Sequence, residues 1–375
     1  MKILFAGGGT AGHINPALAV AGYIKKKAPD AQILYIGAKG GMEERLVPKA
    51  GFEFKGITVS GFKRSFSLSA IKSNLVTVKN AVTASAESKK IIREFGPDIC
   101  MGTGGYVSGP VIRAAAKLGI PTVIHEQNAF PGVTTKMLSK YAKRVMLAMP
   151  QAQKYLNEGC RCVVTGNPVR GEILTADKEQ SRKALGLDGR PVILSFGGSL
   201  GARKINENVA DLIARSGKDG KYQIIHAYGQ YGTWFPGLLR EKGIDPDKCE
   251  NLDIREYIDD MPVCLAASDL VIARAGAITL SEIQAQGKPA VLIPSPNVAE
   301  NHQYHNAMAM VEAGAAVLIE EKDLSGQAVT GTVDRLAGDE AALLKYSENA
   351  KKLAITDANE RIYSVIKKVL GGHTS

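Results

Sequence analysis

With 375 residues the chain is long enough for two domains, and its composition, 45 % apolar and 22 % charged, is that of an ordinary soluble globular protein. The net charge of +10 predicts an anionic partner, which could be nucleic acid, a phosphorylated substrate or an anionic membrane surface. Nucleic acid has the least support, because no helix-turn-helix, zinc-finger or RNP pattern occurs. A solvated basic surface without such a partner is the alternative interpretation.

The cysteines are odd in number and form no CxxC pair, which argues for a reducing compartment and against a disulfide framework or a zinc site. The first residues lead directly into a strand-like run that glycines soon interrupt, unlike a signal peptide. No run of roughly 18 apolar residues is present to span a membrane. We therefore expect a cytoplasmic protein.

The chain opens on a short apolar run, residues 3–6, that is typical of a buried parallel strand. The glycines at 7–9 allow close approaches that a Cβ would block. Asn15 is a good N-cap and Pro16 a good first helical residue, which predicts a helix over residues 17–27. Strand, glycine loop and helix in this order are typical of a nucleotide-binding βαβ unit.

Strand-like and helical stretches then alternate along the chain, the pattern of doubly wound parallel sheets. The strand-like runs include residues 32–36, 98–101, 121–125, 144–148, 192–196, 223–228, 270–273, 290–294 and 316–319.

The opening pattern occurs a second time in residues 192–210. The letters GGSLG at 197–201 match GGTAG at 8–12, although two glycine turns can also look alike by chance. We therefore predict an α/β protein with two Rossmann-like, doubly wound domains, 1–168 and 169–356, facing a cleft lined by the carboxyl ends of both sheets.

Polar residues follow two consecutive strands of the first half. The loop 102–110 comes after one strand, and the letters HEQN at 125–128 end the next. Because the ends of parallel strands share one edge of a sheet, His13, Tyr106, Glu126 and Asn128 could converge there. Their side chains suit the handling of a hydroxyl group, although Asn128 and Ser108 could instead serve as helix caps.

In the second half, the N–H groups of residues 276–279 could hold a diphosphate at the start of a helix. Glu282 follows Thr279 by three residues, so it could complete a capping box or instead bind vicinal sugar hydroxyls. The polar cluster at 299–306 opens another helix after a strand and is expected to face the cleft. The letters DPD at 245–247 predict a turn rather than a metal site.

Seven motifs in order resemble the MurG family, the N-acetylglucosaminyltransferases of peptidoglycan synthesis, which have the GT-B fold. The motifs are GGGTAGHINP (7–16), GTGGYVSGP (102–110), HEQN (125–128), GNPVR (166–170), GGSLGA (197–202), RAGAITLSEI (274–283) and ENHQYHNA (300–307). The resemblance covers nearly the whole chain. It also implies that the amphipathic C-terminal helix, within 357–375, packs back on the first domain.

The resemblance implies transfer of N-acetylglucosamine from UDP-N-acetylglucosamine to the muramyl C4 hydroxyl of lipid I, with inversion, to give lipid II. No cofactor and no obligatory metal are expected, since helix N-termini can stabilise the leaving diphosphate. The implied donor-binding residues are Thr10, Ala11, Gly12, His13, Asn128, Arg170, Ser199, Asn206, Ile258, Ala277, Ile278, Thr279, Glu282, His302 and Gln303. The implied residues for the acceptor diphosphate and lipid are Gly8, Gly9, Gly104, Gly105 and Tyr106. His13 or Glu126 would assist deprotonation of the acceptor hydroxyl, and the sequence does not rank the two.

A lipid acceptor implies a peripheral protein on the anionic cytoplasmic face of the membrane, with other cell-wall enzymes as further candidate partners. Interleaved apolar and basic residues suit an interfacial patch there, the alternative being a partly buried amphipathic helix. The patch residues are Phe62, Lys63, Arg64, Phe66, Leu68, Ile71, Lys72, Leu75, Lys136 and Lys140.

Three rival functions stay open at this point. A UDP-N-acetylglucosamine 2-epimerase would share the fold and the donor but would need no lipid. An NAD oxidoreductase has less support, because the acid expected after the second strand is poorly matched by Asp30. A membrane-associated scaffold with an inactive nucleotide fold is the non-enzymatic alternative.

Overall fold

The computed structural model describes residues 1–59 and 83–372. The chain divides into two compact units, the first formed by Met1–Pro168 with Asp357–Ser375 and the second by Val169–Thr356. Among the described residues, no helix is both long and apolar enough to cross a membrane.

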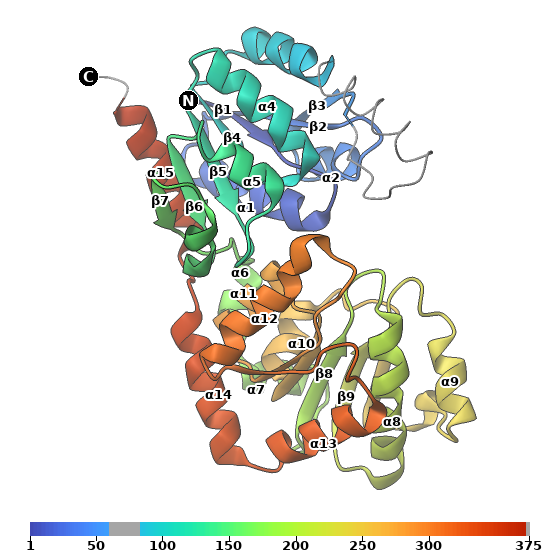
Figure 1. The fold of residues 1–375 in the computed structure, drawn as a ribbon. Helices are drawn as coiled ribbons and strands as arrows, with labels where there is room; N and C mark the ends of the chain where they lie inside the picture. The colour runs from blue at the N-terminus through green and yellow to red at the C-terminus, as the bar shows by residue number, and fades with distance from the viewer. Residues whose placement is uncertain (60–82, 373–375) are drawn as a thin grey trace. The chain divides into compact units, whose positions relative to one another are not determined.

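The described part of the first unit contains a parallel sheet of seven strands in the order β3-β2-β1-β4-β5-β6-β7 (Figure 1). The strands are β1 (Lys2–Ala6), β2 (Gln32–Ala38), β3 (Glu53–Ile57), β4 (Ile99–Gly102), β5 (Thr122–Glu126), β6 (Arg144–Leu147) and β7 (Cys162–Val164). Since β1 pairs with both β2 and β4, the strand order reverses between β1 and β4, and ligands bind at such a reversal in open α/β sheets.

Helices cover both faces of this sheet. They are α1 (Ala11–Lys27), α2 (Glu43–Lys49), a helix over residues 83–95, α4 (Gly105–Lys117), α5 (Val133–Leu138), the 3₁₀ helix η1 (Pro150–Tyr155) and α15 (Ala358–Gly371). One core packs α4 against Leu4 and Leu34, and the other packs α1 and α15 against Ile3 and Phe5. The helix α15, from the far end of the sequence, buries Ile362 and Ile366 in that second core.

The second unit repeats the arrangement with six parallel strands in the order β10-β9-β8-β11-β12-β13. The strands are β8 (Val192–Phe196), β9 (Gln223–Ala227), β10 (Leu252–Arg255), β11 (Leu270–Ala273), β12 (Ala290–Leu292) and β13 (Ala316–Leu318). The order reverses between β8 and β11, which form a parallel pair. The two doubly wound Rossmann-like sheets predicted from the sequence are thus confirmed.

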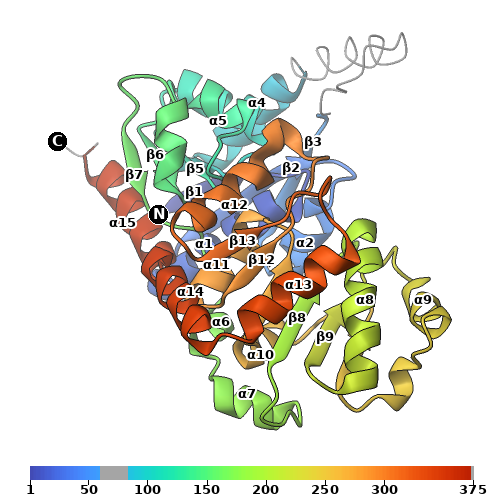
Figure 2. The ribbon, with the colours of Figure 1, turned by 60° about the horizontal axis from the view of Figure 1, so that its bottom comes forward.

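The helices of the second unit are α6 (Gly171–Thr175), α7 (Lys178–Ala184), α8 (Arg203–Asp219), α9 (Phe235–Glu241), α10 (Met261–Ala267), α11 (Ala277–Ala285), α12 (His302–Glu312), α13 (Gly326–Ala337) and α14 (Glu340–Leu353), with the 3₁₀ helices η2 (Pro246–Lys248) and η3 (Ala299–Asn301). Helices α8 and α13 lie side by side on the sheet (Figure 2). Arg215 of α8 and Asp334 of α13 join them by an ion pair of 2.6 Å.

Every strand-like run of the sequence overlaps a strand, and the runs for β8 and β11 have the observed bounds. The sequence did not single out β3, β7 or β10, three of the four edge strands of the described sheets, whereas the fourth, β13, was predicted. The three missed strands are mostly partly exposed, and β3 and β10 alternate polar and apolar residues.

The predicted start of the first helix is wrong. Helix α1 begins at Ala11 with Thr10 as its N-cap, so Asn15 and Pro16 lie inside it. Proline removes only the bond from residue 16 to the carbonyl of Gly12, close enough to the helix start for the chain to tolerate the loss. The consequence is that His13 lies in the first turn of the helix, beside the glycine loop.

Eight of the ten predicted membrane-patch residues lie outside the described residues: Phe62, Lys63, Arg64, Phe66, Leu68, Ile71, Lys72 and Leu75. Lys136 and Lys140 are described, in and just after α5.

Candidate active site

In the first unit, two glycine-rich loops meet where the strand order reverses. The loop after β1 contains Gly7, Gly8 and Gly9, and the turn after β4 leads through Gly104 into α4. A Cβ on Gly105 would lie 2.1 Å from the carbonyl oxygen of Gly8, so only glycine permits the two loops to touch at this point. Gly105 also has a φ of +77°, a conformation that side chains disfavour.

Two hydroxyl groups tie these loops together. Thr103 donates from Oγ1 to the carbonyl oxygen of His13 at 2.7 Å. Ser108 donates to the carbonyl oxygen of Ala6 at 2.6 Å, and accepts from the N–H of Gly104 at 3.0 Å. Ser108 therefore holds the start of α4 on the end of β1. Because it also accepts the N–H of the N-cap residue Gly104, its role is structural and close to the helix-capping alternative considered from the sequence.

The His13 ring lies against both loops. Its Nδ1 is 3.2 Å from the carbonyl oxygen of Gly8 and 3.1 Å from Oγ1 of Thr10. A Cβ on Gly104 would lie 2.7 Å from His13 Cδ2, so this glycine makes room for the imidazole. Tyr106, with 36 % of its surface exposed, covers Gly9, where a Cβ would meet the phenol ring at 2.7 Å.

The structure therefore brings together His13, Gly8, Gly9, Gly104, Gly105 and Tyr106 of the predicted site. Thr10, Ala11 and Gly12 lie exposed at the start of α1, next to this cluster.

Glu126 is held inside a loop of its own. Its buried carboxylate accepts hydrogen bonds from the N–H and the side-chain amide of Asn128, both at 3.0 Å, and from the N–H of Gly132 at 3.1 Å. Three donors on one buried carboxylate fix the loop 128–132 after β5. The arrangement is that of a structural anchor.

The neighbouring side chains of the HEQN motif form a buried network. His125 is 2.9 Å from the carbonyl oxygen of Gly166, and its other ring nitrogen is 3.0 Å from the amide of Gln127. That amide also donates to the carbonyl oxygen of Thr103 at 3.0 Å. Burial lowers the pKa of His125, although the bond to Gly166 opposes the shift, so this histidine is a neutral structural group.

Sequence reasoning missed Glu43, the first residue of α2, whose side chain is fully buried beneath the glycine loop. Its carboxylate accepts from the N–H of Ala38 at 2.9 Å and from the N–H of Gly9 at 3.4 Å. The Gly9 N–H thus points to Glu43, although the sequence had assigned Gly9 to a diphosphate. The pKa of Tyr106 is raised, first by burial and then by the Glu43 charge.

In the second unit, α11 begins at Ala277 with Gly276 as its N-cap, directly after β11. The capping box considered for Thr279 and Glu282 is therefore wrong, because both residues lie inside the helix. Glu282 instead accepts from Nε of Arg170 at 3.1 Å, with 12 % of its side chain exposed. Burial raises the pKa of Glu282, and Arg170 opposes that rise.

The loop after β8 leads into α8, whose N-cap is Ala202. Ser199 is exposed on this loop. Asn206 is buried and donates to the carbonyl oxygen of Tyr228 at 2.8 Å, which holds the segment after β9 next to α8. Ile258, in the segment after β10, is also buried.

The remaining predicted donor residues, His302 and Gln303, are the first two residues of α12. The side-chain oxygen of Gln303 accepts from the N–H of Ser295 at 2.9 Å, and Nδ1 of His302 is 2.7 Å from the carbonyl oxygen of Ala299. Asn301 and Glu300, just before them, have positive φ angles of 48° and 53°, an uncommon conformation for residues other than glycine. Asn306 donates to the carbonyl oxygen of Ala275 at 3.1 Å and so ties α12 to the start of α11.

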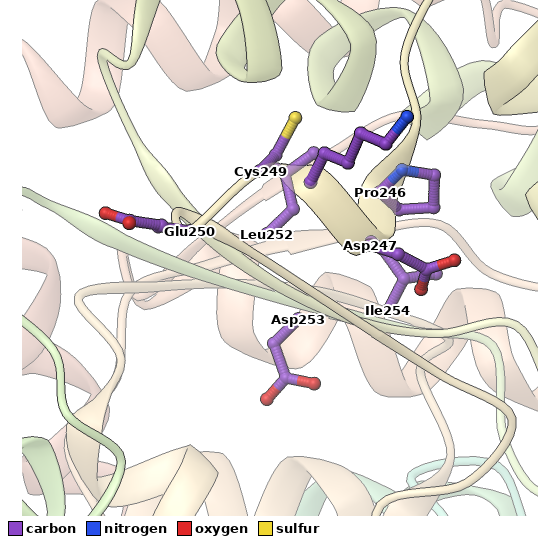
Figure 3. A pocket seen from close by; sticks show the side chains of 8 residues that line it. Pro246, Asp247, Cys249, Glu250, Leu252, Asp253 and Ile254 are labelled. Atoms are coloured by element: carbon purple, nitrogen blue, oxygen red, sulfur yellow. The ribbon is translucent and has the colours of Figure 1, made fainter.

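A cavity of about 540 Å³ lies along η2 and β10 (Figure 3). Its labelled side chains point in different directions and include no residue of the predicted site. The lining residues are Pro246, Asp247, Lys248, Cys249, Glu250, Leu252, Asp253 and Ile254. The DPD letters form the 3₁₀ turn η2, as the proline predicted, and Arg240 pairs with Asp247 at 3.2 Å and with Asp245 at 3.7 Å.

Two doubly wound Rossmann-like units in one chain, with glycine-rich or helix-opening loops where each strand order reverses, are the architecture of the GT-B fold. Residues 3–147 match the glycosyltransferase family 28 N-terminal domain, and residues 192–362 match the glycosyltransferase family 28 C-terminal domain. The chain belongs to glycosyltransferase family 28 and, within it, to the MurG family.

The relatives match along nearly the full chain. The UDP-N-acetylglucosamine–N-acetylmuramyl-(pentapeptide) pyrophosphoryl-undecaprenol N-acetylglucosamine transferase of Acetivibrio thermocellus is 47 % identical over 371 residues, covering 99 % of this chain and 98 % of the relative. The transferase of the same name from Thermoanaerobacter sp. strain X514 is 45 % identical over 376 residues, covering 98 % and 100 %. The crystal structure of MurG from Acinetobacter baumannii has a TM-score of 0.78 at 28 % identity, covering 98 % of this chain and 99 % of that chain.

The residue that follows β2 argues against the NAD oxidoreductase considered from the sequence. The strand ends at Ala38 and is followed by Lys39, whereas NAD enzymes place an acid there to bind the ribose hydroxyls. The first glycine loop therefore lacks the partner that an NAD site requires.

Proposed function

We propose that this chain transfers N-acetylglucosamine from UDP-N-acetylglucosamine to the muramyl C4 hydroxyl of lipid I, giving lipid II and UDP. The observation that carries the proposal is the near-full-length match, at 42–47 % identity, to transferases that bear the name of this reaction. The reaction breaks the anomeric C–O bond to UDP and forms a new bond to the acceptor oxygen. The site must therefore hold two diphosphates, stabilise the leaving UDP and accept the hydroxyl proton.

We assign the uptake of that proton to His13. The sequence left His13 and Glu126 as alternatives, but three N–H donors in its own loop occupy the Glu126 carboxylate. His13 instead lies beside Gly104, at the start of α4, where the acceptor is expected. An imidazole suits this step because histidine ordinarily titrates near neutral pH. Glu126 then positions Asn128 without touching the reacting atoms.

For the acceptor diphosphate, we propose the N-terminus of α4 together with Gly8 and Tyr106. This helix has 13 residues and an N-cap without a side chain, so its positive end can face an anion closely. The Tyr106 phenol can donate a hydrogen bond to a phosphate oxygen, and burial followed by the Glu43 charge raises its pKa further above the usual value of a phenol.

For the donor, we propose that the start of α11 holds the UDP diphosphate. Its first N–H groups, at Ala277, Ile278 and Thr279, follow a glycine N-cap that offers no side-chain oxygen to them. Ser199 would add a hydroxyl donor and Arg170 a charge. Glu282, held within reach of the same helix start, would bind the ribose hydroxyls.

The other donor contacts are proposed with different roles. Ile258 would contact uracil, while His302 and Gln303 would contact the sugar hydroxyls. Asn206 is buried and its side-chain amide donates to the carbonyl oxygen of Tyr228, so we propose that it shapes the loop after β9. Thr10, Ala11 and Gly12, with Asn128, would border the transferred sugar; no cofactor is required for this chemistry.

We further propose that the described part of the membrane patch is a basic and aromatic surface on α5 and η1. Lys136 lies 3.9 Å from the ring centre of Phe130, which packs on Tyr155 at 4.4 Å. Val133 and Met137 on the same helix are 52 % and 54 % exposed. Exposed apolar residues beside lysines, Lys140 among them, suit the interface of an anionic membrane on the cytoplasmic face.

The test of the proposed function uses purified protein, UDP-N-acetylglucosamine labelled in the sugar, and a lipid I analogue in EDTA. Label in the lipid product with one UDP released per transfer is the expected result. Epimerised sugar, or UDP released without acceptor, would instead favour the epimerase or a hydrolase, and donor binding without any reaction would favour the scaffold.

The test of the base assignment compares His13→Ala with Glu126→Gln in the same assay. General-base catalysis contributes roughly 10²–10⁴-fold, so we expect His13→Ala to lower turnover by at least about a hundredfold. Turnover of His13→Ala within about tenfold of the parent would remove His13 from this role.

A further inference from the structure

The Gly8–Gly9 peptide group lies between two ionisable side chains. Its N–H, on Gly9, is 3.4 Å from Oε2 of Glu43, and its C=O, on Gly8, is 3.2 Å from Nδ1 of His13. The described chain has no cis peptide bond, and in a trans peptide the N–H and C=O point in opposite directions. Glu43 and His13 thus contact the two ends of one peptide dipole.

The space around Glu43 is built for this side chain. A Cβ on Gly8 would lie 2.1 Å from Glu43 Oε1, one on Gly37 would lie 2.3 Å from Glu43 Cγ, and one on Gly41 would lie 2.8 Å from Oε2. Glycines in the loop after β1 and in β2 and the turn that follows it therefore leave room for one buried carboxylate. Glu43 is also the first residue of α2, where the positive end of the helix favours a negative charge.

Two contacts to Nδ1 bear on which ring nitrogen of His13 carries the proton. The Thr10 hydroxyl, 3.1 Å from Nδ1, can donate or accept and therefore fits either tautomer, so the Gly8 carbonyl oxygen is the contact that distinguishes them. A carbonyl oxygen only accepts, so the 3.2 Å contact between Nδ1 and Gly8 is a hydrogen bond only when Nδ1 carries the hydrogen. In a neutral imidazole, Nε2 then has the lone pair. A Cβ on Gly104 would lie 3.1 Å from that Nε2, so Nε2 lies beside the glycine turn that begins α4.

We propose that Glu43 is a positioning residue that acts on His13 through the Gly8–Gly9 peptide group. The carboxylate holds the peptide N–H, the peptide C=O holds His13 Nδ1–H, and Nε2 is thereby the atom that accepts the hydroxyl proton. A negative charge at the N–H end also increases the negative charge on the carbonyl oxygen, which strengthens its bond to an imidazolium as the proton arrives. The role rests on the proposed function, because it requires His13 to be the base.

Ring ¹⁵N NMR tests the arrangement without substrate. In protein labelled at its six histidines, the signals of His13 are assigned by their loss in His13→Gln. We expect neutral His13 to carry its hydrogen on Nδ1. Hydrogen on Nε2 in the parent protein would overturn the inference, whatever the variants do and whether or not the chain transfers sugar.

The variant arm compares Glu43→Gln with Glu44→Gln. Glu44 is the matched control, because it also accepts a backbone N–H, that of Gly40 at 2.7 Å, but does not touch the Gly8–Gly9 peptide. We expect Glu43→Gln to give a mixture of His13 tautomers and to lower kcat about tenfold, with KM for the donor within about twofold. This loss is smaller than the ~10⁴-fold found where a carboxylate contacts the base directly.

Glu44→Gln should leave both the tautomer and kcat unchanged. An unchanged His13 tautomer in Glu43→Gln, with kcat equal to that of Glu44→Gln, would overturn the role of Glu43 and leave the transferase function intact. The parent protein could instead fail to transfer sugar while His13 carries its hydrogen on Nδ1 and loses that preference in Glu43→Gln. That result would support the action of Glu43 on His13 through the Gly8–Gly9 peptide group and would overturn the proposed function.

Discussion

The contact between the two glycine loops gives the sharpest prediction, through Gly105→Ala. Gly105 has a φ of +77°, and an alanine Cβ would lie 2.1 Å from the carbonyl oxygen of Gly8. A normal contact of carbon with oxygen needs more than 3 Å, so the two loops must separate by about 1 Å, and both are backbone. Because Gly8 holds Nδ1 of His13, the imidazole must move as well.

Gly119→Ala is the matched control for this change. Gly119 has the same φ of +77° and lies in the same unit, two residues after the end of α4, but no atom lies within 4 Å of its Cβ position. The left-handed conformation costs an alanine about 1–2 kcal/mol at either position. The difference between the two variants therefore isolates the clash with Gly8 from the conformational cost.

A displacement of about 1 Å in a positioned catalytic group can lower the rate by about a hundredfold. We therefore expect Gly105→Ala to lose about a hundredfold in kcat in the lipid I assay, and Gly119→Ala to stay within about twofold of the parent. Urea unfolding of both variants measures the stability change and confirms that each is folded. Turnover of folded Gly105→Ala within about threefold of Gly119→Ala would refute the reasoning.

Two further predictions concern the second unit. Glu282→Gln should raise KM for UDP-N-acetylglucosamine by about 10–100-fold with a smaller change in kcat, because hydrogen bonds to a charged group contribute about 1.5–3 kcal/mol; an unchanged KM would remove Glu282 from the ribose site. Burial lowers the pKa of His226 to about 3, although a backbone bond to Ser195 opposes the shift. An unfolded histidine titrates near pH 6.5, so the unfolded state binds the extra proton between these values, and the unfolding free energy should fall by up to about 1.4 kcal/mol per pH unit below pH 6.5. His226→Phe should reduce that slope in urea titrations at pH 6.5 and 5, and an equal slope in the variant would contradict the buried, neutral state of His226.

The buried strands could be predicted from the sequence because they are covered on both faces. Residues 192–196 and 270–273 are apolar runs with turn residues on either side, and they give β8 and β11. The edge strand β10 reads LDIR and is only partly buried, so its residues follow no apolar pattern. The apolar pattern of a sequence signals burial, and it is absent from an edge strand such as β10 but present in the edge strand β13, which reads AVL.

The arrangement of the candidate site could be predicted where its residues lie in loops that follow strands. His13, Gly104 and Gly105 lie in glycine-rich segments that directly follow strands, so the parallel sheet alone brings them together. Glu43 could not be found in this way, because it is 34 residues from Gly9 and begins a helix after the neighbouring strand. Recognising it needs the position of α2 under the loop, which depends on how β1 and β2 pack.

For Glu126, the sequence predicts the position of the residue but not the role of its side chain. Its position at the end of β5 is correctly inferred from the sequence, but the sequence does not say what its carboxylate contacts. Two of its three donors are the backbone N–H groups of Asn128 and Gly132, which every residue type except proline supplies. A carboxylate that anchors a loop and one that serves as a base look the same until the loop is folded.

The return of the chain to the first unit has a consequence for biosynthesis. The core around Phe5 and Val20 is completed by Ile362 and Ile366 of α15, which leave the ribosome only after the whole second unit has been made. The second unit is continuous in sequence, so it can fold as soon as it is synthesised. The half of the protein that is translated first is thus the half that is finished last, and until then the part of this core that α15 covers has no partner from its own chain.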